Sequence, residues 1–266
     1  MYSQIENLNE YPIQFINAFD ELNNRKRNLF NLSYIDQFLD FNDKKNICIV
    51  NRISQSNFLY HLITNLCIYS FENKEKYKTI IVDSGKGSNL GYLYLEIINR
   101  RSNTLYNIDE ILKNITIVRT FTFYQLANIV IKAIPKFINQ NLNCKIQIII
   151  LDLLDTFPSS LSLSTLSNKN KIDNNINLNY NLRILEQIID KLNQISSTYF
   201  VILSYNSFNT LLDNIIIPKF SNRLEIGLVN NNIAKKITED NNIIINIHSK
   251  SNRIKSFMLS EKTKKD

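Results

Sequence analysis

The sequence has few of the residues that usually build a catalytic or metal site. Its 266 residues include three cysteines, two histidines and no tryptophan. Because Cys48, Cys67 and Cys144 are widely spaced and form no C-x-x-C pair, they predict reduced, structural thiols in an intracellular protein. With only His61 and His248, a histidine-based metal site or a Ser-His-Asp triad has little support.

Glycine and proline are also scarce, with four of each, and no apolar run reaches the ~18 residues that a membrane span needs. Hydrophobic residues make up 44% of the chain and charged residues 21%, a composition that predicts one extended α/β domain rather than general disorder. The 41 asparagines indicate a biased composition, so a single asparagine says little about function. The net charge of +7 favours a polyanionic partner without requiring one.

Short apolar runs alternate with helical segments through most of the chain. We expect strands at 47–50, 79–83, 115–118, 145–151 and 199–204, and helices at 58–71, 124–137 and 182–195, with a further helix that ends near residue 101. This alternation predicts βαβ units on a mainly parallel sheet flanked by helices. Short alternating segments at 224–228, 243–247 and 255–259 predict antiparallel strands at the C-terminal edge.

The chain divides into three parts. Residues 1–40 are polar and predicted helical, as a linker or oligomerisation segment; residues 41–260 form the core domain; residues 261–266 are a basic tail. Within the core, 156–181 and 205–222 are expected to be long connections, the first either a functional loop or disordered. The stretch 250–266 carries six basic and two acidic residues, which fits either a nucleic-acid contact or a solubilising tail.

The carboxyl ends of the parallel strands are where a ligand would bind. A phosphate-binding loop after the first strand needs glycines, a lysine and a serine or threonine. The stretch from Asn51 includes Ser56 but no glycine, and it has Asn57 at the lysine position and Phe58 at the Mg²⁺-ligand position. Asp152 ends the fourth strand as the Mg²⁺-binding acid of P-loop NTPases does, although a loop-capping carboxylate is the simpler interpretation.

Several segments, in this order, resemble the RecA/RadA-type strand-exchange recombinases and their paralogues. They are IVDSG at 81–85, NITIVRTFTFYQL at 114–126, KIQIIILD at 145–152 and VILSYN at 201–206. The resemblance covers about residues 15–260. It implies a RecA-like core of the P-loop-NTPase type, with a degenerate nucleotide site.

The same resemblance implies partner and DNA contacts. Phe15 and Ala18 stand as in the family's Phe-x-x-Ala motif, which joins neighbouring subunits; the alternative is a helix that packs Phe15 and Phe19 on its own domain. Residues 156–181 and 206–222 correspond in position to two loops that face DNA in the family. The cations available there are Lys169, Lys171, Lys219 and Arg223, and solvated loops with incidental lysines are the alternative.

The departures from the family favour binding over catalysis. Active members carry a glutamate that orients the attacking water after the second strand, and here Gly85 stands in its place. We therefore expect a non-catalytic recombinase paralogue in homologous recombination and DNA repair, with a recombinase partner and with single-stranded DNA as a second candidate ligand. No metal or cofactor is expected, and weak binding of ATP and Mg²⁺ stays open.

Two other functions remain compatible with the sequence. One is a DNA-dependent ATPase with a non-standard phosphate loop, in which Lys86 or Arg52 replaces the lost lysine and Asp152 holds Mg²⁺. The other is a RecA-fold scaffold with no nucleic-acid role. For all three we expect an intracellular protein away from membranes, in the cytoplasm or nucleoid of a prokaryote or the nucleus of a eukaryote.

Overall fold

The computed structural model describes most of the chain. The described residues are 2–4, 30, 32–39, 41, 44–52, 58–72, 77–85, 90–91, 93, 96–97, 108–158, 171–207, 210–228, 242–249 and 254–261.

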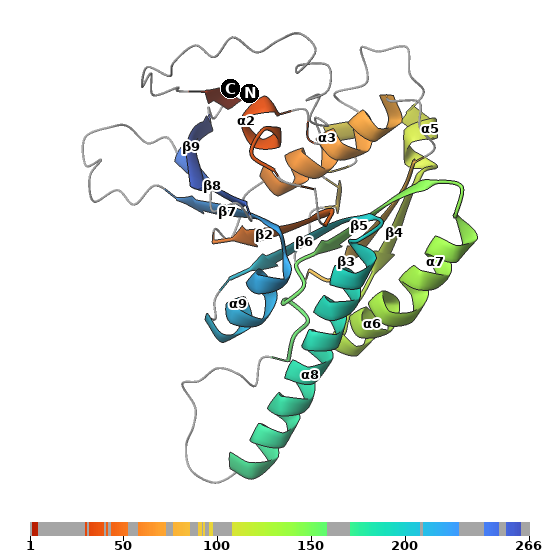
Figure 1. Cartoon of the computed structure of the whole chain (residues 1–266), viewed down its shortest axis with the longest axis vertical. Helices are drawn as coiled ribbons and strands as arrows, with labels where there is room; N and C mark the ends of the chain where they lie inside the picture. Colours follow the sequence, from red (N-terminus) through yellow and green to blue (C-terminus); the bar gives the residue numbers. More distant parts are fainter. Residues whose placement is uncertain are drawn as a thin grey trace, which may run out of the picture.

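One mixed sheet contains strands β2 to β9. Their bounds are β2 (Asn46–Asn51), β3 (Tyr77–Asp83), β4 (Ile115–Arg119), β5 (Lys145–Leu151), β6 (Phe200–Asn206), β7 (Asn222–Leu228), β8 (Asn242–Ser249) and β9 (Ile254–Glu261). The order β7-β2-β6-β5-β3-β4 is parallel throughout, and β8 and β9 extend it antiparallel beyond β7. A mainly parallel sheet with an antiparallel C-terminal edge is thus confirmed (Figure 1).

Helices cover both faces of the parallel strands (Figure 1). One face carries α2 (Ser33–Asp36), α3 (Phe58–Glu72) and α5 (Ile108–Leu112). The other carries α6 (Phe123–Asn128), the π-helix η1 (Ile129–Ala133), α7 (Ile134–Gln140), α8 (Lys171–Ile195), α9 (Thr210–Ile216) and the 3₁₀ turn η3 (Ile217–Lys219).

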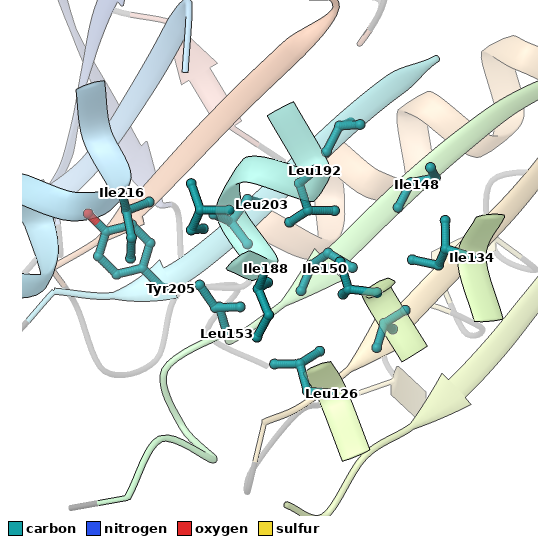
Figure 2. Packing of buried hydrophobic residues seen from close by; sticks show 14 of the residues in the cluster. Leu126, Ile134, Ile148, Ile150, Leu153, Ile188, Leu192, Leu203, Tyr205 and Ile216 are labelled. Atoms are coloured by element: carbon teal, nitrogen blue, oxygen red, sulfur yellow. The ribbon is translucent and has the colours of Figure 1, made fainter. Parts of the chain in front are cut away.

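Side chains of the parallel strands alternate between two apolar cores, because both faces of the sheet are covered. In β2, Ile47 and Ile49 pack in the core beneath α3, whereas Cys48 and Val50 pack in the core beneath α8. Figure 2 shows the second core, where Ile188 and Leu192 of α8 lie against Ile150 of β5 and Leu203 of β6. The continuous Ile/Val/Leu runs of the sequence follow from this two-sided burial.

Two segments expected as loops are helical instead. Residues 171–181 form the first part of α8, in which Ile172, Ile176 and Tyr180 recur every four residues within an asparagine-rich segment. Within 205–222, α9 and η3 form because Leu212 and Ile216, four residues apart, bury one helix face against the sheet.

Two strand expectations are also corrected. The sequence predicts β7 only as part of an antiparallel hairpin, but β7 also runs parallel to β2. Its residues alternate in the sequence because Leu224 and Ile226 are buried while Arg223 and Glu225 point to the other face. Residues 2–4, expected to be helical, form β1 (Tyr2–Gln4), which pairs antiparallel with β9. The free edge of β9 provides the hydrogen bonds that this segment takes up.

The helix expected at 124–137 runs from 123 to 140 with a π-helical turn in its middle. Pro135 has no N–H to bond the carbonyl four residues earlier, and the N–H of Ile134 bonds the carbonyl of Ile129, five residues back. The wider turn accommodates the proline without ending the helix.

Candidate functional site

The carboxyl ends of β2, β6, β5 and β3 lie side by side and bring together the polar residues that follow each strand. Asn51 ends β2, Asn206 ends β6, Asp152 follows β5 and Asp83 ends β3. We call this row of strand ends the carboxyl edge. Because β5 lies between β6 and β3, Asp152 is near its centre.

Asp152 has an unusual backbone conformation, with φ of 53° in the left-handed region. Hydrogen bonds from both neighbouring strands hold this conformation. The Asp152 N–H donates to Ser204 Oγ at 3.1 Å, and the Ser84 hydroxyl, which donates to the Leu151 carbonyl at 2.7 Å, lies 3.0 Å from the Asp152 carbonyl. The backbone of Asp152 is thereby held in place between β6 and the turn after β3.

The Asp152 carboxyl group is partly buried beside two other acids. Burial, together with the negative charges of Asp155 and Asp83, raises its pKa from 3.8 to about 7. Near neutral pH the group is therefore protonated in a large fraction of molecules.

Gly85 lies directly against Asp152. A Cβ atom at position 85 would meet Asp152 Oδ2 at 2.6 Å and Asp152 Cβ at 3.2 Å, both closer than normal van der Waals contact. Gly85 does not have a positive φ, so its backbone conformation does not require glycine. Glycine is required because a larger side chain would collide with Asp152. The position that carries a catalytic glutamate in the resembling family has no room for a side chain in this arrangement.

Asp83 supports the turn after β3. It is fully buried; its Oδ1 accepts a hydrogen bond from the Gly85 N–H at 3.0 Å, and its Oδ2 lies 3.5 Å from Arg119 Nε. The Thr120 N–H donates to its backbone carbonyl at 2.8 Å. These contacts give Asp83 a structural role that joins β3 to β4.

Among the described residues at the end of β2, Arg52 is the cation that could contact a phosphate. Asn51 is buried, and its carbonyl accepts from the Ser207 N–H at 3.0 Å, while Phe58 is fully buried at the start of α3. Arg52 is exposed, and its guanidinium contacts Ser207 Oγ at 3.3 Å and Glu225 Oε1 at 3.4 Å. Ser56, Asn57 and Lys86 lie outside the described residues.

The described cations predicted to bind DNA lie at the opposite end of the sheet from Asp152. The Lys219 carbonyl accepts from Asn46, the first residue of β2, at 3.4 Å, and Lys219 Nζ lies 2.8 Å from Asp190 on α8. Arg223, near the start of β7, is partly buried. The structure thus does not bring Lys219 and Arg223 to the carboxyl edge.

A charged network surrounds Arg223. Its Nε lies 3.4 Å from Glu225 Oε1 without hydrogen-bond geometry, so that contact is Coulombic, and its NH2 lies 3.1 Å from His248 Nδ1. Burial and the neighbouring Arg223 lower the pKa of His248. Arg223 is therefore engaged within the sheet.

The remaining predicted contacts are only partly described. Lys171 begins α8, but its side chain is outside the described part of the structure. Phe15, Ala18 and Lys169 lie outside the described residues altogether.

Sequence reasoning missed a group of exposed aromatic side chains beside the carboxyl edge. Phe121, Tyr124 and Tyr180 are 75%, 52% and 57% exposed, and the rings of Tyr124 and Tyr180 have centroids 6.5 Å apart. The run of Thr122 to Gln125 could have indicated this, because Thr-x-x-Gln is a capping box that places the adjacent aromatic residues at a helix start.

Among the described residues, no group of three or more His, Cys, Asp or Glu side chains could hold a metal ion. The described helices also include none that is long and apolar enough to cross a membrane.

Comparison with known proteins identifies no relative: no protein-family model and no curated protein matches the chain.

Proposed function

We propose that this protein is a RecA-like core that binds rather than catalyses, a recombinase paralogue acting in homologous recombination and DNA repair. It binds a recombinase partner through Phe15 and Ala18, and it binds single-stranded DNA on the side of the carboxyl edge. The α/β sheet with its antiparallel C-terminal edge supports this proposal, because it agrees with the architecture that the family resemblance implies.

The observation that carries the proposal is the packing of Asp152 against Gly85. Phosphoryl transfer depends on positioned charges: a lysine on the phosphates, an acid on Mg²⁺ and a residue that orients water. In this chain the glutamate position is Gly85, the Asp152 carboxyl group has a pKa of about 7, and the lysine position is Asn57. The loss of these positioned charges supports binding rather than catalysis.

A nucleotide titration tests the loss of catalysis. We expect labelled ATP with Mg²⁺ to show no saturable binding at micromolar concentrations and no hydrolysis above background. Micromolar affinity, or hydrolysis that disappears in Asp152→Asn, would instead establish the ATPase with a non-standard phosphate loop. Arg52→Ala is the matched variant for that alternative, because it would remove the substitute cation.

A binding assay with the purified recombinase of the same host tests the partner contact. We expect the wild-type protein to bind and Phe15→Glu to bind at least tenfold more weakly, since a buried aromatic anchor commonly contributes 2 kcal/mol or more. The thermal midpoint of Phe15→Glu should equal that of the wild type. A lowered midpoint would show that Phe15 packs on its own domain.

A mobility-shift assay with single-stranded DNA separates this proposal from a scaffold without a nucleic-acid role. Contacts to phosphates weaken steeply as salt rises. We therefore expect a shift at about 50 mM salt that is lost near 200 mM. No shift at the lower concentration would favour the scaffold.

A further inference from the structure

Two pairs of exposed side chains lie at the end of β4 and around the start of α6: Arg119 with Phe121, and Tyr124 with Tyr180. We call these four side chains together the aromatic patch. Arg119 ends β4, and its guanidinium carbon lies 5.8 Å from the centre of the Phe121 ring, within cation–π distance. Tyr124 lies in the first turn of α6 and faces Tyr180 of α8. The patch thus joins two elements that are distant in the sequence.

Polar contacts, rather than burial of the rings, hold this patch in place. Gln125 Oε1 accepts hydrogen bonds from the backbone N–H groups of Phe121 at 2.9 Å and Thr122 at 3.2 Å. The Tyr124 hydroxyl donates at 3.0 Å to Oδ1 of Asn181, whose side chain is buried. The backbone and the tyrosine are therefore fixed while the ring surfaces remain open to a ligand.

The two segments that carry the patch contain only positive charges, whereas the carboxyl edge beside them carries Asp152 and Asp155. In the segments 119–128 and 178–184 the only charged residues are Arg119 and Arg183. Arg183 is exposed and lies one helical turn from Tyr180, on the same side of α8. Asp83, which pairs with Arg119, is fully buried and presents no charge at the surface.

Open aromatic rings with cations between them match the chemistry of a single-stranded nucleic acid. Bases stack on aromatic rings regardless of sequence, and arginines contact the phosphates between them. We propose that Phe121, Tyr124 and Tyr180 stack bases of single-stranded DNA, with Arg119 and Arg183 at its backbone. This inference rests on the proposed function, for which it names the DNA-binding surface.

Anisotropy of a labelled 20-nucleotide oligothymidylate at about 50 mM salt tests the proposal with the full chain. We expect Phe121→Ala and Tyr180→Ala each to weaken binding by about 5- to 150-fold, the range reported by alanine substitution at stacked bases. Tyr180→Phe keeps the ring and should bind as the wild type does. So should Leu142→Ala, which removes an exposed side chain in the turn before β5.

An abasic strand of the same length and charge separates stacking from phosphate contact. We expect the wild type to bind it less tightly than oligothymidylate, and Tyr180→Ala to cause no further loss. If the alanine variants bind oligothymidylate as the wild type does, the stacking surface is refuted while DNA binding stands. If the wild type binds neither the oligothymidylate nor the abasic strand, both the stacking surface and the proposed DNA binding are refuted. If Tyr180→Ala loses recombinase binding instead, the patch is a protein interface.

Discussion

The Asp152 carboxyl group occupies the space that a side chain at position 85 would need, and Gly85 is the residue that permits this. The contact distance of 2.6 Å from a Cβ at position 85 to Asp152 Oδ2 makes the two positions dependent on each other. An acid at the end of β5 and a side chain after β3 cannot both be accommodated without rearrangement.

Gly85→Ala should therefore lower the free energy of unfolding by about 1–3 kcal/mol, the usual cost of overpacking. In the Gly85→Ala background, Asp152→Gly should restore part of this loss, because glycine removes the clash and adopts positive φ without strain. Urea unfolding of the two single variants and the double variant measures the coupling. Gly227→Ala is the control, since a Cβ there has no atom within 4 Å, and strictly additive losses would contradict the prediction.

The raised pKa of Asp152 predicts a pH dependence of stability. The folded state holds this proton up to a pH of about 7, whereas the unfolded chain releases it near 3.8. Stability from this group is therefore full below about pH 4 and falls as pH rises to about 7, by at most about 4 kcal/mol. Asp152→Asn should be more stable than the wild type at pH 8 and nearly equal to it at pH 4. An equal difference at both pH values in urea unfolding would show that the pKa is not raised.

The Asp213 carboxylate should stabilise the fold by holding the connection between β6 and α9. Asp213 is buried, and its carboxylate accepts from the Tyr205 hydroxyl at 2.9 Å and from Ser207 Oγ at 2.6 Å. Tyr205→Phe should cost about 1.5–3 kcal/mol, since the lost hydrogen bond reaches a charged group. Asp213→Ala should cost more, because it leaves the buried tyrosine hydroxyl without this acceptor. Thermal and urea unfolding would measure both, and a neutral Tyr205→Phe would refute the argument.

Lys171, the first residue of α8, and Lys219 of η3 should differ in their effect on DNA binding. Lys171 begins α8 beyond the carboxyl edge, whereas Lys219 bonds Asp190 at the opposite end of the sheet. We expect Lys171→Ala to reduce the slope of log affinity against log salt by about 0.7, the single-strand value for one phosphate contact, and Lys219→Ala to leave it unchanged. Because the Lys219–Asp190 pair is exposed, Lys219→Ala should cost less than ~1 kcal/mol of stability. The reverse order of salt slopes would place the DNA at the amino ends of the strands.

The parallel strands could be predicted from the sequence because burial on both faces leaves a continuous apolar run. KIQIIIL at 145–151 is β5 with the expected bounds, and the strand expected at 47–50 extends by one residue at each end. The first part of α8 was not predicted because its many asparagines are typical of a loop, although Ile172, Ile176 and Tyr180 recur at helical spacing. β1 could not be predicted because its partner, β9, is at the other end of the chain.

The candidate site could be predicted only where a strand end defines it. Asp152 and Gly85 lie at the carboxyl edge as expected, but their mutual contact depends on the order β6-β5-β3, which no local pattern specifies. Likewise, Tyr124 and Tyr180 are 56 positions apart in sequence and meet only because α6 and α8 pack together. Sequence patterns therefore predicted the helices and strands. The order of the strands in the sheet determined which side chains meet at the candidate site.

The pairing of Tyr2 with Glu261 places the first and last described strands of the chain side by side at one edge of the sheet. A pulling force applied through the two ends of the chain would act on this pair first and would open β1 from β9 one hydrogen bond at a time, in the unzipping direction. The carboxyl ends of β3 and β5 lie several strands further into the sheet, so they would bear load only after β9, β8 and β7 had separated. Mechanically, the outer hairpins protect the Asp152–Gly85 contact.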